Sequence, residues 1–73
     1  MEISTQKQIL QEEITRYDNT VYLWTVRCKV AKKIDDKVME DNAKVELEKC
    51  IKSIDVLTEE LKSLDRVSQD TKI

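Results

Sequence analysis

The fold is decided within residues 31–47, where the chain reads AKKIDDKVMEDNAKVEL. Apolar residues recur at steps of three and four on both sides of this stretch, but the phase of the repeat changes across it. The change coincides with the acidic pairs Asp35-Asp36 and Glu40-Asp41, whose side chains are suited to turns and helix caps. We therefore expect a connection between two helices at residues 36–41.

Each side of the connection carries one apolar seam of the heptad type, in which steps of four and three alternate. The first seam predicts a helix over residues 5–35, and the second predicts a helix over residues 42–66 followed by a frayed polar tail at 67–73. Thr5 and Gln8 have the spacing of a capping box at the start of the first helix. The first seam consists of Leu10, Ile14, Tyr17, Val21, Trp24, Cys28 and Ala31, and the second consists of Ala43, Leu47, Cys50, Ile54, Leu57, Leu61 and Leu64.

The two seams can face each other if the chain folds back on itself. In an antiparallel pair, residues at equal distances from the turn have numbers with a constant sum. Cys28 with Cys50 and Ile14 with Leu64 share the sum 78, which centres the turn near Met39. We therefore expect an all-α, antiparallel, coiled-coil-like two-helix hairpin that forms one domain over residues 1–73. The alternative is one continuous helix with a stutter in its repeat.

Composition supports long helices and a need for association. The chain has 73 residues, of which 38% are charged, and it contains no Gly and no Pro. Chains this short usually need disulfides, a metal or oligomerisation to be stable. Residues 1–34 carry six bases and four acids, whereas residues 35–73 carry seven bases and eleven acids. This asymmetry favours antiparallel packing of the two halves.

The residues on which most catalytic and metal chemistry depends are missing. The sequence has no His, the commonest general base and zinc ligand, and no Gly for a phosphate-binding loop. Cys28 and Cys50 lack the spacing of a zinc site, and we expect buried free thiols, with a disulfide as the alternative. The acidic pairs predict solvated faces or caps, with a weak divalent-cation site at the turn as the alternative. We predict no enzyme, no catalytic residue, no metal and no cofactor.

The first helix carries a second apolar face, which its partner helix cannot cover. It lies about 145° around the helix from the seam, given about 100° per residue. Contiguous exposed apolar surface generally marks an interface. We expect this face to pack in a homodimer, which would form a four-helix bundle, or to dock on a different protein in the helix-in-groove manner. The predicted partner or oligomer interface comprises Leu23, Val26, Val30 and Ile34.

These features predict a non-catalytic protein–protein interaction module, such as an adaptor, a small chaperone or assembly factor, or an inhibitor of bacterial or phage origin. The alternative is a small nucleic-acid-associated regulator that uses the basic stretch 27–33. That stretch contains Arg27, Lys29, Lys32 and Lys33, but its aromatic neighbour Trp24 belongs to the seam and is expected in the core.

Targeting signals give a further expectation. The longest uncharged run, Asn19 to Val26, is far shorter than the about 20 apolar residues of a membrane span. Residues 1–5 show no basic segment followed by an apolar one, as a signal peptide would. We therefore expect no membrane association and a cytoplasmic location.

Overall fold

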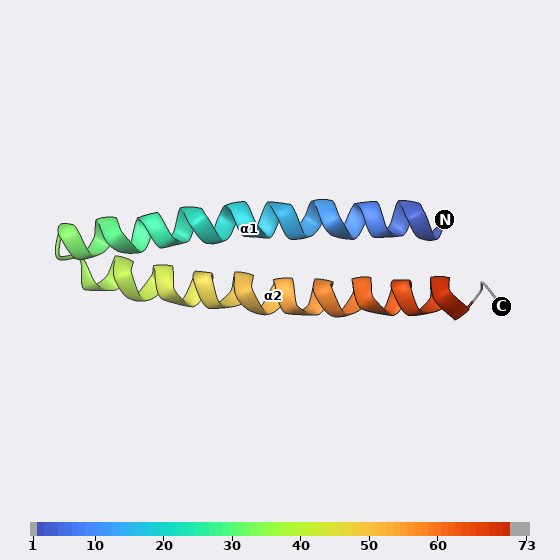
Figure 1. The fold of residues 1–73 in the computed structure, drawn as a ribbon. Helices are drawn as coiled ribbons and strands as arrows, with labels where there is room; N and C mark the ends of the chain where they lie inside the picture. The colour runs from blue at the N-terminus through green and yellow to red at the C-terminus, as the bar shows by residue number, and fades with distance from the viewer. Residues whose placement is uncertain (1, 71–73) are drawn as a thin grey trace.

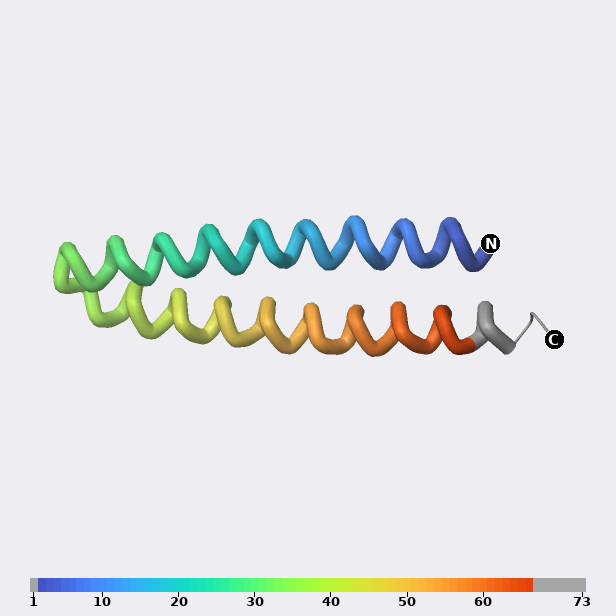
Figure 2. Tube along the Cα trace, in the orientation of Figure 1, coloured from blue at the N-terminus to red at the C-terminus, as the bar shows by residue number. Residues whose placement is uncertain are grey.

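The computed structural model describes residues 2–70, including the side chains of residues 2–66. Two helices fill this range: α1 spans Ile3–Lys33 and α2 spans Lys37–Asp70. They run antiparallel and side by side, so that the start of α1 and the end of α2 lie at the same end of a rod of 59 × 15 × 14 Å (Figure 1; Figure 2). The expected all-α hairpin is confirmed, and the continuous helix is excluded.

The helix boundaries differ from those that the sequence predicts. The second helix begins at Lys37, five residues before the expected start at 42, so the connection covers residues 34–36 and not 36–41. The predicted tail at 67–73 is wrong where it overlaps α2, which continues to Asp70, and residues 71–73 lie outside the described residues. Because the chain contains no Gly and no Pro, no strong helix-breaking residue stops either helix at the predicted boundaries.

The turn is built by two consecutive acids. Asp35 has a φ of 60°, in the left-handed region that Gly favours and that Asp tolerates better than most residues. The Asp35 and Asp36 N–H groups donate to the carbonyls of Lys32 and Ala31, at 3.3 and 2.9 Å, which is the bond pair of a Schellman cap. Asp36 Oδ1 accepts a hydrogen bond from the Met39 N–H at 3.1 Å and thereby caps α2.

The second acidic pair lies inside α2, not in the turn. Lys37 Nζ lies 3.4 Å from Glu40 Oε1 and 3.5 Å from Asp41 Oδ1. These charges, that of Asp41 most of all, raise the pKa of Lys37. The contacts of Glu40 and Asp41 with Lys37 stabilise the first turn of α2, where acids also complement the helix dipole. Met39 lies in this turn of the helix and is not the centre of the connection.

The predicted capping box at the start of α1 is also wrong. The N-cap is Glu2, which has an extended backbone and makes no side-chain cap hydrogen bond. Thr5 and Gln8 lie within the helix, where the Gln8 amide donates to the Glu12 carboxylate at 3.3 Å. The helix begins at Ile3, two residues before the predicted cap, and Ser4 and Thr5 lie in its first turn.

The seams meet, but in a register different from the predicted sum of 78. Leu10 shares a surface hollow with Leu64, and Tyr17 shares another with Leu57, so the numbers of the seam residues that share a hollow sum to 74, which we call the seam sum. Leu64 therefore lies across from Leu10, and the expected pairing with Ile14 is wrong. The physical reason is the three-residue turn at Asp35, which closes the hairpin earlier in the chain.

Burial confirms which faces the helices turn toward each other. All fourteen predicted seam residues are buried or half-buried. The buried core of the described chain is small: Ala31, Ala43 and Cys50 are 0%, 1% and 6% exposed. Both cysteines are free thiols, as expected, although Cys28 is only half-buried. Two helices alone thus leave every larger seam side chain partly open to solvent.

Candidate functional site

The predicted interface on α1, which we call the α1 stripe, consists of Leu23, Val26, Val30 and Ile34. Leu23, Val30 and Ile34 are 45%, 44% and 61% exposed, and Val26 is half-buried. A helix in a two-helix hairpin buries one side only, and the seam occupies that side of α1. The stripe therefore stays at the surface of the hairpin.

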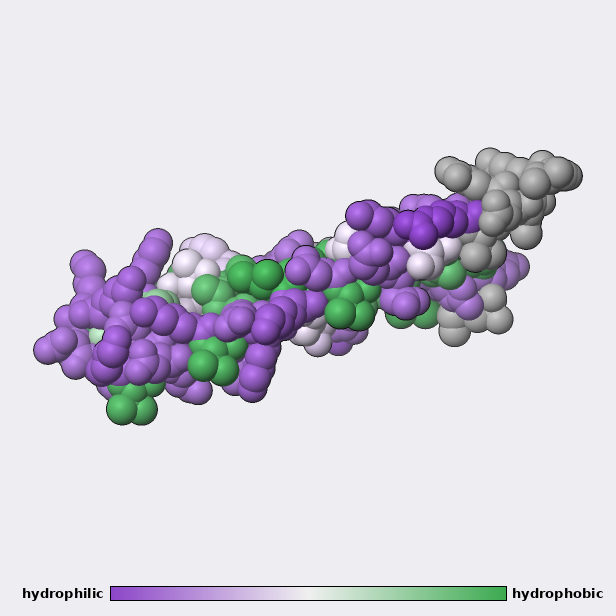
Figure 3. Space-filling model, turned by 90° about the horizontal axis from the view of Figure 1, so that it is seen from below, coloured by the Kyte–Doolittle hydropathy of each residue, from purple (hydrophilic) through white to green (hydrophobic). Residues whose placement is uncertain are grey.

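Apolar side chains on α2 are exposed as well. Seen from the side of α2, apolar residues reach the surface in separate patches between charged side chains (Figure 3). Of the four exposed residues, the three valines are separated by seven and eleven positions and share one side of α2, whereas the isoleucine lies on another side. The four residues are Val38, Val45, Ile51 and Val56.

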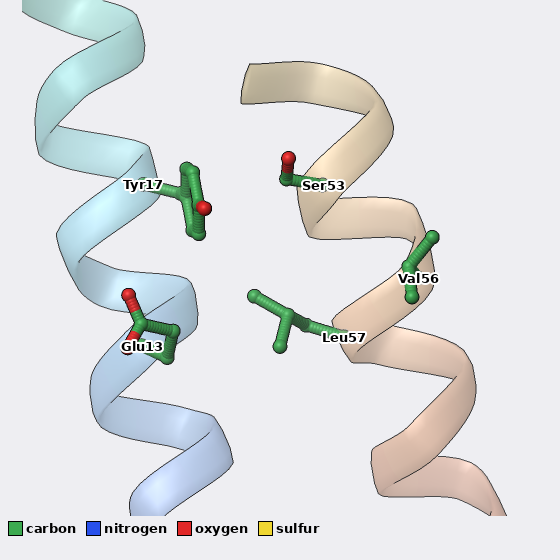
Figure 4. A pocket seen from close by; sticks show the side chains of 5 residues that line it. All are labelled: Glu13, Tyr17, Ser53, Val56 and Leu57. Carbon is green, nitrogen blue, oxygen red and sulfur yellow. The ribbon is translucent and has the colours of Figure 1, made fainter. Parts of the chain in front are cut away.

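Two hollows open between α1 and α2 in the half of the rod away from the turn. The first has a volume of about 310 Å³ and is lined by Glu13, Tyr17, Ser53, Val56 and Leu57. The second has a volume of about 410 Å³ and is lined by Gln6, Ile9, Leu10, Glu60 and Leu64. Figure 4 shows Tyr17 and Leu57 pointing from opposite helices into the space between them, with Ser53 at the level of Tyr17 and Glu13 at the level of Leu57.

The two hollows repeat each other one heptad apart. Tyr17 and Leu10 are separated by seven residues, as are Leu57 and Leu64, and Ser53 and Glu60. Seven residues make almost two helical turns, so residues with this spacing share one side of a helix. Both hollows therefore open on the same side of the hairpin, which we call the hollow flank.

Most of the α1 stripe lies on the hollow flank too. Leu23 and Val30 follow Ile9, which lines a hollow, at fourteen and twenty-one residues. Ile34 follows Glu13, which lines the other hollow, at twenty-one residues. Val26 belongs to a neighbouring row. The flank therefore combines exposed apolar side chains near the turn with apolar hollows near the chain ends.

Charges near the turn are not neutralised across the hairpin. Among the described side chains, the ion pair that joins the two helices is Lys7 with Asp65, and the remaining pairs lie within one helix. The bases of residues 27–33 form no ion pair with the described acids of α2. Arg27 instead places its guanidinium 4.6 Å from the centre of the Trp24 ring.

Within residues 2–70, no three His, Cys, Asp or Glu side chains gather as metal ligands. Within the same range, no helix is long and apolar enough to cross a membrane.

Sequence reasoning found the α1 stripe but missed the hollows. A hollow forms where helices meet across small or polar side chains, so its position depends on the register of the two helices. The register predicted from the sequence, with a constant sum of 78, brings the wrong residues together. The signal in the sequence was the position of Ser53, which precedes a seam residue and is too short to fill the space beside Tyr17.

Comparison of the chain with known protein families, with curated proteins and with solved structures gives no match.

Proposed function

We propose that the protein is a non-catalytic protein–protein interaction module that acts through the α1 stripe. In its self-associated form, a second copy covers the stripe and makes a four-helix bundle with α1 of each copy at the centre. The observation that carries the proposal is the exposure of Leu23, Val30 and Ile34, which are 44–61% exposed on one contiguous side of a folded helix.

The surface area of the hairpin supports association. The chain exposes 5725 Å², whereas a compact monomer of 8.6 kDa would expose about 4700 Å². The excess of about 1000 Å² is comparable with the about 800 Å² that each partner buries in an interface of standard size. The rod thus has enough additional surface for one such interface without losing its two-helix core.

The energetics point the same way. Full burial of one Leu, Ile or Val contributes about 1.5–3 kcal/mol, so covering three half-exposed residues per chain contributes about 2–4 kcal/mol. That amount matters for a hairpin whose buried core consists of two alanines and one cysteine. Association through the stripe would stabilise the fold and perform the function with the same side chains.

A pair of matched double variants tests the proposal. Leu23→Glu with Val30→Glu places two carboxylates on the stripe, and we expect it to abolish association while α-helical circular dichroism persists. The control, Tyr22→Glu with Ile51→Glu, adds the same charge at two exposed positions whose spacing from the hollow-lining residues places them on the other side of the hairpin. Equal association of the two variants by sedimentation velocity would show that the stripe is not the interface.

A second candidate function is supported by the basic stretch. Arg27, Lys29, Lys32 and Lys33 are exposed, and no acid in the described part of the chain forms an ion pair with them. Clustered bases without partners can contact phosphate groups. A mobility shift that weakens with added salt, and that is lost in the Lys29→Gln, Lys32→Gln, Lys33→Gln variant, would favour a nucleic-acid-associated regulator.

A further inference from the structure

We propose that the partner on the hollow flank is a second copy of the chain in antiparallel orientation, so that the turn of each hairpin lies beside the chain ends of the other. Leu23 and Val30 of one copy then fill the hollows at Tyr17 and Leu10 of the other. This inference rests on the proposed self-association and adds its orientation and register.

The spacing of the two features is the first support. Leu23 and Val30 are seven residues apart on α1, and so are the hollow-lining residues Tyr17 and Leu10. Both distances along the helix are therefore about 10.5 Å, at about 1.5 Å per residue. A single antiparallel register, in which facing α1 residues sum to 40, places Leu23 at Tyr17 and Val30 at Leu10. A two-fold axis then passes near Thr20, and the same contacts form twice.

Charge is the second support, and it comes from residues that the spacing argument does not use. In the same register, Arg27 of one copy faces Glu13 of the other. Arg27 has no acidic partner among the described side chains of its own chain. Glu13 has only Arg16, at 3.8 Å, and the Arg16 side chain is 76% exposed, so this contact exchanges readily with solvent or with a better partner.

Charge also selects the orientation. In a parallel dimer about an axis along the rods, each residue on the shared side of α1 meets its own counterpart. Arg27 would then face Arg27, and Glu13 would face Glu13, and such like-charge contacts disfavour an arrangement strongly. The antiparallel orientation replaces both repulsive contacts with attractive ones.

Two complementary charge reversals test the arrangement. In Arg27→Glu chains, the introduced carboxylate would face Glu13 of an identical copy, and in Glu13→Arg chains, the introduced guanidinium would face Arg27. We expect each variant alone to self-associate at least about tenfold more weakly than the unmodified chain. A mixture of the two variants can pair an introduced carboxylate with an introduced guanidinium. We expect it to form a heterodimer within about threefold of the original affinity, measured by sedimentation velocity at low salt.

The mixture also controls for damage to the fold, because a misfolded variant cannot be rescued by its complement. Lys29→Glu is the matched control, since Lys29 is exposed on another row of α1 and should leave the dimer intact. If the unmodified chain dimerises but the mixture stays monomeric, the antiparallel register is wrong, while the proposed function still stands on the stripe variants. If the unmodified chain stays monomeric at every concentration, a second copy is not the occupant and the inference is overturned.

Discussion

Lys7 near the start of α1 forms an ion pair with Asp65 near the end of α2, and this contact records the register in which the two helices meet. The two residue numbers sum to 72, close to the seam sum of 74 and six below the sum of 78 predicted from the sequence. Lys7 also occupies a seam position, three residues before Leu10, where a long side chain can reach across to the other helix.

A double-mutant cycle on this pair checks the register. We expect Lys7→Met and Asp65→Asn to show a coupling free energy of about 0.2–1 kcal/mol, toward the lower end because Asp65 is 54% exposed and solvent screens the pair. The measurement is urea unfolding of the two single variants and the double variant. The same cycle with Asp55→Asn in place of Asp65→Asn should give no coupling, and equal coupling in both cycles would argue against the observed register.

Substitution at the left-handed turn position should raise stability. Asp35 has a φ of 60°, a conformation that costs a residue with a Cβ about 1 kcal/mol relative to Gly. We expect Asp35→Gly to increase the free energy of unfolding by about 0.5–1 kcal/mol, and Asp35→Val to decrease it by at least about 1 kcal/mol. Chemical denaturation monitored by circular dichroism measures both. A destabilising Gly together with a neutral Val would indicate that the turn lies elsewhere.

The seam and the outer surface of α1 should differ in their tolerance of aromatic truncation. Trp24 is a half-buried seam residue, whereas Tyr22, two residues earlier, is 72% exposed. We expect Trp24→Ala to cost about 2–4 kcal/mol, somewhat less than a fully buried Trp, and Tyr22→Ala to stay within about 0.5 kcal/mol of the unmodified chain. The measurement is the shift in thermal unfolding temperature. Similar losses for the two variants would contradict the division between seam and surface.

The face that each helix turns toward the other could be predicted from the sequence, whereas the pairing across that face could not. The helical period assigns Leu10, Tyr17 and Leu64 to the seams, because residues three or four positions apart share one side of a helix. Whether Leu64 meets Leu10 or Ile14 depends on how far one seam slides along the other, and the apolar spacing within each helix does not fix that offset.

The turn shows why the sequence predicts the wrong register. Two acidic pairs are candidates for the turn, and composition alone does not separate Asp35-Asp36 from Glu40-Asp41. What separates them is backbone geometry: Asp35 takes the left-handed conformation and Asp36 caps α2 through Met39. The absence of Gly removed the residue type that usually marks such a position.

The sequence by itself determined two amphipathic helices, their facing seams and the uncovered stripe at Leu23, Val30 and Ile34, because these properties follow from periodicity within a single helix. Only the tertiary structure decided the length of the turn, the register and therefore the two hollows at Tyr17 and Leu10. Those features depend on how residues 40 to 54 positions apart along the chain come to lie opposite one another once the turn closes, which no local spacing specifies.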